Sequence, residues 1–240
     1  MTTGAGRLRT EAMERIREIG RHPLPSLAWP RGCYGAARAW LLFVGPSPGG
    51  LEGSAPPSRP WDEEPLHNVV FDDFRDWNGG FPVSMEPLVT GLIGLPFRLS
   101  GRLYAIANLD WKKTPRASEV STDHMKAGLP DMFEVLKMTQ ARVLVPMTRQ
   151  VARLLIDYLR EEKGAQIDYV TNQVRIPIGT AGTKCHRQID TWLVTGPSRS
   201  GIQGVRIVRL PQHPARIFTK PYAARISREV RRVIAALDRP

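Results

Sequence analysis

The segment Ala39-Trp40-Leu41-Leu42-Phe43-Val44, followed by the turn Gly45-Pro46-Ser47-Pro48-Gly49-Gly50, decides the fold that we predict for this chain. A short, continuous apolar run that ends at Gly and Pro is typical of a strand buried on both faces. Such a strand belongs to a parallel sheet that helices cover, and ligands of these sheets bind beyond the carboxyl ends of the strands. The turn is therefore a candidate active-site loop.

Three more apolar segments, at residues 103–107, 141–146 and 205–210, predict further strands of the same sheet. Helical spacing and capping residues predict the helices: residues 11–19 after the N-cap Thr10, a helix that Ser84 caps and that breaks near Gly94 and Pro96, residues 132–138, a helix after the N-cap Thr148, and residues 221–237. Alternating residues at 167–178 and 188–194 predict an inserted β-hairpin. We therefore expect an α/β protein, a three-layer α/β/α sandwich with a central four-stranded parallel sheet and an inserted β-hairpin.

The length of 240 residues suits one large α/β domain, and no break in composition suggests a second. Within this single domain, residues 1–38 form an N-terminal helix and a Pro-rich lead-in, and residues 51–82 form a long active-site loop. Loops of that length are usually functional lids or disordered linkers, and the aromatic residues of this one argue against disorder. Because the chain has neither a signal peptide nor an apolar run of about 18 residues, we expect a cytoplasmic protein without membrane contact.

The net charge is +11 and the pI is about 10.2, and the charge is unevenly distributed. Residues 205–240 carry nine Lys and Arg against two acids, so +7 lies there and +4 on the other 204 residues. A basic end favours a polyanionic partner, nucleic acid first, and the alternative is a basic helix face that meets only solvent. Residues 52–76, by contrast, carry seven acids and two bases. That segment is either a solvated acidic surface or the source of a carboxylate for a site where positive charge develops.

The two cysteines, Cys33 and Cys185, are far apart and belong to no Cys-x-x-Cys pair. Cysteine alone therefore supplies neither a zinc site nor a four-thiolate iron–sulfur cluster. We expect two ordinary reduced thiols and no metal site.

Polar turns follow three of the predicted strands, at Gly45-Pro46-Ser47-Pro48-Gly49, at Asn108 and at His213-Pro214-Ala215. In order and position they resemble motifs of the uracil-DNA glycosylase superfamily: a Gly-x-x-Pro turn after the first strand, an Asn at the end of a middle strand, and a His-Pro-Ser-type loop after the last strand. The resemblance spans residues 39–237.

The resemblance implies a hydrolase, a monofunctional DNA glycosylase that flips a uracil-like or modified pyrimidine out of DNA and cleaves its N-glycosidic bond, leaving an abasic site. Asn108 would read the base edge, since an amide offers one acceptor and two donors. His213 would stabilise the negative charge on the departing base. Gly45 and Pro46 would form the pocket floor. An aromatic residue of the long loop would stack on the base: Phe71 or Phe81, ahead of Phe74 and Trp77. No metal or organic cofactor is expected.

The same comparison implies how DNA would be held. Backbone N–H groups of Ser47, Gly49 and Gly50 would grip the phosphates around the flipped nucleotide. Ile217 would wedge into the base stack, Lys220 would hold a phosphate, and Arg216 would either hold a phosphate or fill the space that the flipped base leaves. Apart from the resemblance, the spacing of apolar residues in the last helix turns its arginines outward, so Arg228 would contribute from that outer face. We expect the partner to be DNA, duplex or single-stranded, and the protein to be a monomer.

The chain departs from the superfamily at the residue that positions the attacking water. Known uracil-excising members have an Asp, Asn or Glu in the first motif, whereas Ser47 stands here and serine is a poor base; Ala215 also replaces the Ser of the last motif. Three alternatives remain: the sugar cation needs little help, the protein binds DNA without cutting it, or a carboxylate comes from elsewhere. The candidates for that carboxylate are Asp72, Asp73, Glu52 and Asp110.

These alternatives leave several functions open. Base excision can serve repair of uracil or defence against phage whose DNA carries bulky modified bases. The main rival to an enzyme is a non-catalytic DNA-binding member of the same fold. A more distant one is a phosphate-binding α/β enzyme that uses residues 45–50 as its cradle, although this turn lacks the Lys and the spacing of a P-loop.

Overall fold

The structure is a computed structural model that describes residues 4–21, 33–36, 38–47, 80–110, 119–170, 175–177, 186–195, 201–210 and 220–237. Its strands are β1 (Cys33–Gly35), β2 (Leu41–Gly45), β3 (Tyr104–Asn108), β4 (Val143–Pro146), β5 (Ile167–Val170), β6 (Arg175–Pro177), β7 (His186–Gln188), β8 (Asp190–Val194) and β9 (Arg206–Arg209). Its helices are α1 (Gly4–Arg21), α3 (Gly80–Ile93), α4 (Phe97–Ser100), a single 3-10 turn (Gly101–Leu103), α5 (Thr122–Ala127), α6 (Leu129–Thr139), α7 (Arg149–Glu161) and α8 (Lys220–Leu237).

Seven of the described strands form one mixed sheet, in the order β1-β3-β2-β4-β9-β8-β5. The neighbours β3, β2, β4 and β9 run parallel, which confirms the predicted parallel core of an α/β protein. Because parallel strands point the same way, their carboxyl ends lie along one edge of the sheet. We call this edge the carboxyl rim and define it by the last residues of the four strands: Asn108, Gly45, Pro146 and Arg209.

The sheet is wider than the predicted four strands. β1 pairs antiparallel with β3 at one edge, and β8 and β5 extend the sheet antiparallel from β9 at the other. The predicted hairpin therefore belongs to the main sheet at its base, and only β6 and β7 form a separate two-stranded ribbon. The physical reason is that an unpaired β9 would leave a row of backbone donors and acceptors open, and β8 satisfies them.

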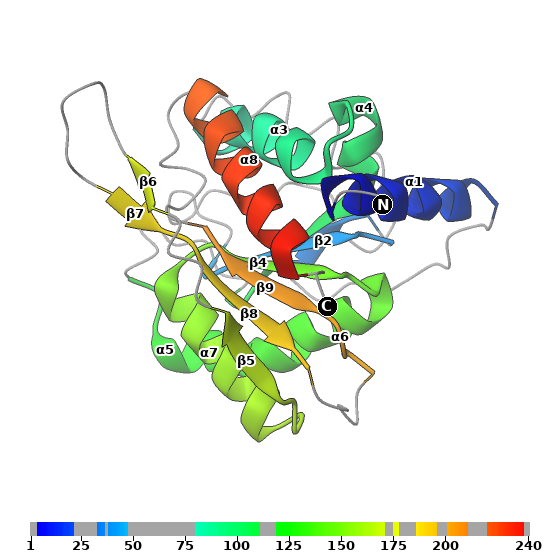
Figure 1. The fold of residues 1–240 in the computed structure, drawn as a ribbon. Helices are drawn as coiled ribbons and strands as arrows, with labels where there is room; N and C mark the ends of the chain where they lie inside the picture. Colours follow the sequence, from blue (N-terminus) through cyan, green and yellow to red (C-terminus); the bar gives the residue numbers. More distant parts are fainter. Residues whose placement is uncertain are drawn as a thin grey trace, which may run out of the picture.

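Helices lie on both sides of the sheet, with α1, α3 and α8 on one side and α5, α6 and α7 on the other (Figure 1). α3 and α8 pack closely where Gly91 of α3 faces Ser227 of α8. The absence of a side chain at Gly91 permits this approach, since a Cβ atom there would lie 1.8 Å from Oγ of Ser227. Within the described ranges, no helix is both long enough and apolar enough to cross a membrane.

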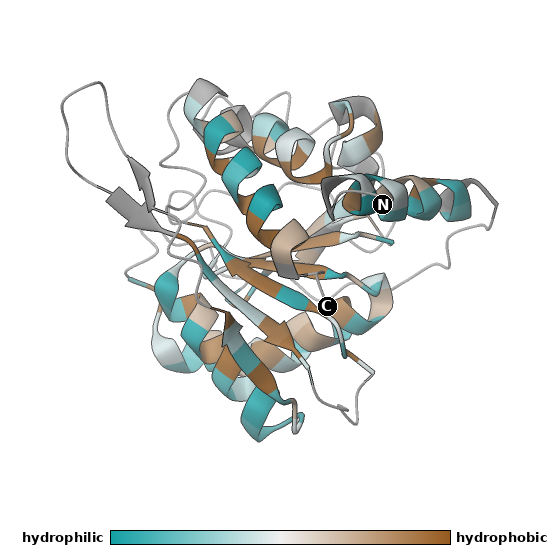
Figure 2. Cartoon of the chain, in the orientation of Figure 1, coloured by the Kyte–Doolittle hydropathy of each residue, from teal (hydrophilic) through white to brown (hydrophobic). Residues whose placement is uncertain are grey.

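The apolar run that precedes the Gly45 turn forms the centre of the core. Every residue of β2 and of its neighbour β3 is buried, and both strands are largely apolar (Figure 2). Phe43 and Tyr104 meet edge to face, with ring centroids 6.0 Å apart. The prediction of a strand buried on both faces is confirmed.

Helix starts follow the capping signals only in part. Thr148 caps α7 as expected, since its Oγ1 accepts a hydrogen bond from the backbone N of Val151 at 3.1 Å. The prediction that Thr10 is an N-cap is wrong: α1 begins at Gly4, and the Thr10 hydroxyl donates to the carbonyl of Gly6. Leu8, before the expected cap, is fully buried, so packing extends the helix toward the N-terminus.

The prediction that Ser84 is an N-cap is also wrong, because α3 begins four residues earlier at Gly80. Pro82 therefore lies in the first turn of the helix, where its missing N–H would have had no intrahelical partner. The predicted break near Gly94 and Pro96 is confirmed, since α3 ends at Ile93 and α4 begins at Phe97.

Candidate active site

Two of the three predicted motif segments meet at the carboxyl rim. Gly45 at the end of β2 is in register with Asn108 at the end of β3. Beyond the strands, the backbone N of Leu109 donates to the carbonyl of Gly45 at 3.0 Å, and that of Asp110 donates to the carbonyl of Pro46 at 2.9 Å. The parallel ladder thus continues into the turn and fixes the first motif against the segment after β3.

The Asn108 side chain is placed by the absence of a side chain at Gly45. A Cβ atom at Gly45 would lie 2.6 Å from Oδ1 of Asn108 and 3.4 Å from Sδ of Met147. Asn108 is only 6% exposed, so its amide lies inside the rim. A buried amide in a fixed position can distinguish hydrogen-bond donors from acceptors on a ligand edge, and the role of Asn108 as such a reader stays a prediction.

Asp110 lies in the same segment and faces a histidine that no sequence motif singles out. Asp110 is 5% exposed, and its Oδ2 is 3.3 Å from Nδ1 of His124 in α5. The backbone N of His124 donates to Oγ of Ser121, the N-cap of α5, at 3.1 Å. The Ser-Thr-Asp run before His124 is an N-cap signal that could have revealed α5, but no sequence pattern pairs residues 110 and 124.

The junction of α5 and α6 presses against this segment. A Cβ atom at Gly128 would lie 1.8 Å from the carbonyl oxygen of Leu109, which stands between Asn108 and Asp110. Backbone atoms cannot move aside as a flexible side chain can, so only glycine fits at position 128 without displacing the rim.

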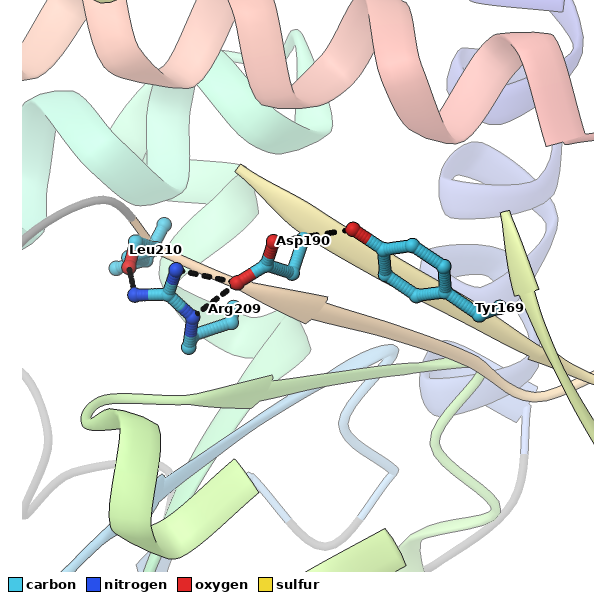
Figure 3. A network of polar contacts seen from close by, with 4 residues as sticks. All are labelled: Tyr169, Asp190, Arg209 and Leu210. Atoms are coloured by element: carbon cyan, nitrogen blue, oxygen red, sulfur yellow. Dashed lines mark hydrogen bonds and ion pairs between the residues drawn. The ribbon is translucent and has the colours of Figure 1, made fainter. Parts of the chain in front are cut away.

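A second polar network, which no sequence motif indicates, lies where β8 and β9 reach the rim (Figure 3). Nε of Arg209 donates to Oδ2 of Asp190 at 2.7 Å, and Nη2 binds the same oxygen. The Tyr169 hydroxyl donates to Oδ1 of Asp190 at 3.3 Å, and Nη1 of Arg209 donates to the carbonyl of Leu210 at 3.3 Å. The network fastens the antiparallel extension of the sheet to the end of β9.

Several predicted site residues lie outside the described residues, so the structure does not test their roles. They are Gly49, Gly50, Glu52, Phe71, Asp72, Asp73, Phe74, Trp77, His213, Ala215, Arg216 and Ile217. Phe81 and Lys220 lie in the first turns of α3 and α8, with side chains outside the described part of the structure. Ser47, directly after Pro46, is partly buried. Of the four candidate carboxylates, only Asp110 lies in the part of the chain that the structure describes.

The basic face of α8 is present, with one correction. Arg225, Arg228 and Arg232 are exposed, as predicted. Arg231 was also expected to point outward, but it is partly buried, because Gly94 has no side chain and a Cβ there would lie 2.3 Å from Nη1 of Arg231. Burial lowers the pKa of Arg231, and the positive charge of Arg9 on α1 lowers it further.

Cys33, at the edge of the sheet beside β3, is fully buried. Burial raises the pKa of its thiol from 9.0 to about 12; hydrogen bonding with the backbone of Asn108 acts in the opposite direction, and the charge of Asp131 adds to the rise. A buried thiol of this kind is unreactive. Among the described residues, no group of three or more His, Cys, Asp or Glu side chains could hold a metal ion.

Cys33 should make the free energy of unfolding fall as the pH rises from 9 to about 12. In this range the unfolded chain loses the thiol proton while the folded protein keeps it, so the unfolded state is favoured. We expect urea titrations at several pH values to show this slope and Cys33→Ala to make it shallower. An equal slope in both proteins would contradict the assignment.

The described part of the rim joins a buried amide to a carboxylate–imidazole pair. An amide can read the edge of a ligand, and a carboxylate–imidazole pair can hold or transfer a proton. Comparison of the chain with protein-family models and with curated proteins found no match in either. Functional assignment therefore depends on the chemistry of these residues.

Proposed function

We propose that this protein is a monofunctional DNA glycosylase that hydrolyses the N-glycosidic bond of a flipped uracil-like or modified pyrimidine. The observation that supports this most is the Asn108 amide, buried at the end of β3 and held against the Gly45–Pro46 turn of the neighbouring strand. Pyrimidines differ in the donors and acceptors of their polar edge, so an amide fixed in one position can distinguish among them.

The finer fold that we propose is the α/β/α sandwich of the uracil-DNA glycosylase superfamily. Support comes from helices on both sides of the sheet and from the order of the first two motifs on adjacent parallel strands. β9 is parallel to the same strands, so the chain leaves the sheet at the carboxyl rim just before the segment that contains His213. His213 stays the proposed group that stabilises the departing base, with Phe71 or Phe81 as the stacking residue.

Release of a base tests the proposal directly. Duplexes that contain one uracil, hypoxanthine or glucosylated hydroxymethylcytosine are incubated with the protein, and abasic sites are then cleaved with alkali. We expect strand breaks at one of the modified positions and none in the unmodified duplex. Binding to every duplex without a break in any of them would favour the non-catalytic DNA-binding alternative.

Reversing the charge of the outer face of α8 should weaken DNA binding in a salt-dependent way. Arg225 and Arg228 are both exposed one turn apart, and each phosphate contact contributes about 0.9 to the slope of log K against log salt. For the double variant Arg225→Glu and Arg228→Glu we expect that slope to fall by about 2 in fluorescence-anisotropy titrations.

Arg153→Glu provides the matched control for this experiment. Its side chain is 84% exposed on α7, on the opposite side of the sheet from α8. Arg153→Glu reverses one charge where the double variant reverses two. A fall of the slope by about 1 in this control would therefore show that total charge, and not the face of α8, determines binding.

A further inference from the structure

We propose that Asp110 and His124 form the dyad that activates water in this reaction, with His124 as the base and Asp110 as the residue that positions it. The inference rests on the proposed glycosylase function and assigns its hydrolytic step. It is carried by the 3.3 Å approach of Oδ2 of Asp110 to Nδ1 of His124 at the carboxyl rim.

The two residues are held from both sides. Asp110 is fixed through its backbone N, which donates to the carbonyl of Pro46 in the first-motif turn. His124 is fixed through its backbone N, which donates to the N-cap Ser121. α5 is in turn attached to α7, because Nε2 of Gln150 donates to Oγ1 of Thr122 at 3.0 Å. A base must be held in position to act efficiently: these contacts fix the backbones of both residues, and the bond from Nδ1 to Asp110 orients the imidazole.

The positioning residue, Asp110, is buried, whereas the proposed base, His124, is exposed to solvent. The Asp110 side chain is 6% exposed and that of His124 is 56% exposed. A buried carboxylate that accepts a hydrogen bond from Nδ1–H fixes the neutral tautomer in which Nε2 carries the lone pair. The exposed imidazole remains accessible to water and to a nucleotide at the rim.

The dyad supplies what the first motif lacks. Ser47 stands where known uracil-excising members have an acid or amide, and it lies next to Pro46, whose carbonyl binds the backbone of Asp110. In the proposed step, water oxygen bonds to the sugar C1′ as the bond from C1′ to the base nitrogen breaks. The bond's electron pair leaves with the base, and one water proton passes to Nε2 of His124. The released base takes up one proton from solvent and His124 returns its proton to solvent, so the net reaction adds OH to C1′ and H to the base nitrogen.

Substitutions at both positions test the roles separately. With saturating enzyme and the duplex that the wild type cleaves, we expect His124→Ala to slow base release about 100- to 1,000-fold without weakening DNA binding. His124→Asn keeps an N–H donor near the position of Nδ1 but has no atom that replaces the basic Nε2, so it should be as slow as His124→Ala. Asp110→Asn should also be slow. Asp123→Asn, an exposed carboxylate on the same helix, is the control and should retain the wild-type rate.

A spectroscopic measurement tests the pairing of Asp110 with His124 and does not require base release. A long-range ¹H–¹⁵N correlation spectrum of the full chain should show His124 as the Nδ1–H tautomer, and Asp110→Asn should shift it toward Nε2–H. An Nε2–H tautomer in the wild type, or wild-type rates in His124→Ala or His124→Asn, would overturn the dyad while leaving the glycosylase proposal intact. Absence of base release from every duplex in the wild type would instead overturn the glycosylase proposal, and the dyad with it.

Discussion

Asn108→Ala is expected to lower the single-turnover rate of base release by about 100- to 1,000-fold, the usual cost of removing one fixed hydrogen-bonding group from an active site. The amide is buried beside Gly45 at the end of β3, so in the proposed reaction the substitution removes a fixed donor and acceptor from the rim. The measurement is single-turnover base release, with urea unfolding to show that the variant is folded.

Two further substitutions determine whether the lower rate comes from the loss of the amide's hydrogen bonds or from the removal of any buried polar group. Asn108→Asp keeps the shape but replaces the two amide donors with acceptors, so it should be as slow as Asn108→Ala. Ser100→Ala removes another buried polar group, which lies on the amino side of β3, away from the carboxyl rim. Ser100→Ala should retain the wild-type rate. An Asn108→Ala variant that is folded and works within about threefold of the wild type would refute the reading role.

Gly128→Ala should affect both stability and activity. The new Cβ would meet the carbonyl of Leu109 at 1.8 Å, and relief requires a shift of the backbone that bears Asn108 and Asp110. Overpacking of this kind costs about 1–3 kcal/mol in the free energy of unfolding. We expect that loss in urea titrations, together with slower base release in the fraction that remains folded.

Gly164→Ala is the matched control for Gly128→Ala. Gly164 has a φ of +61°, and a Cβ added there would meet no atom within 4 Å, so the substitution costs only the backbone strain of about 1–2 kcal/mol. It should leave base release unchanged. If both variants released base at the same rate, the contact between Gly128 and Leu109 would not matter for the rim.

The parts of the fold that could be predicted are those in which local sequence and burial agree. β2 and β3 are apolar apart from Asn108 at the end of β3, and their residues are buried without exception. The cap at Thr148 was predictable because a hydroxyl at that position satisfies the first backbone donors of α7. By contrast, Thr10 has the same capping chemistry but lies within α1, because burial of Leu8 outweighs the local preference.

The site was only partly predictable, for a related reason. Asn108 and the Gly45 turn could be placed together because both follow parallel strands. Asp110 contacts His124, which is 14 positions further along the chain and belongs to α5. Asp190 contacts Arg209, which is 19 positions further along and is its partner on the neighbouring strand. Periodicity describes one element at a time, so it contains no information about which side chains of two elements will meet.

The hydrogen bonds that continue the ladder past β2 and β3 have a consequence for how the rim moves. The amides of Leu109 and Asp110 are bonded to the turn as the strand amides are bonded to each other, and both residues are buried, so exposing them to solvent requires this end of the ladder to open. Hydrogen exchange at these two amides should then be slower than at exposed backbone amides of α5. For the proposed glycosylase, a rim held in this way would act as a rigid template that rejects a poorly fitting base.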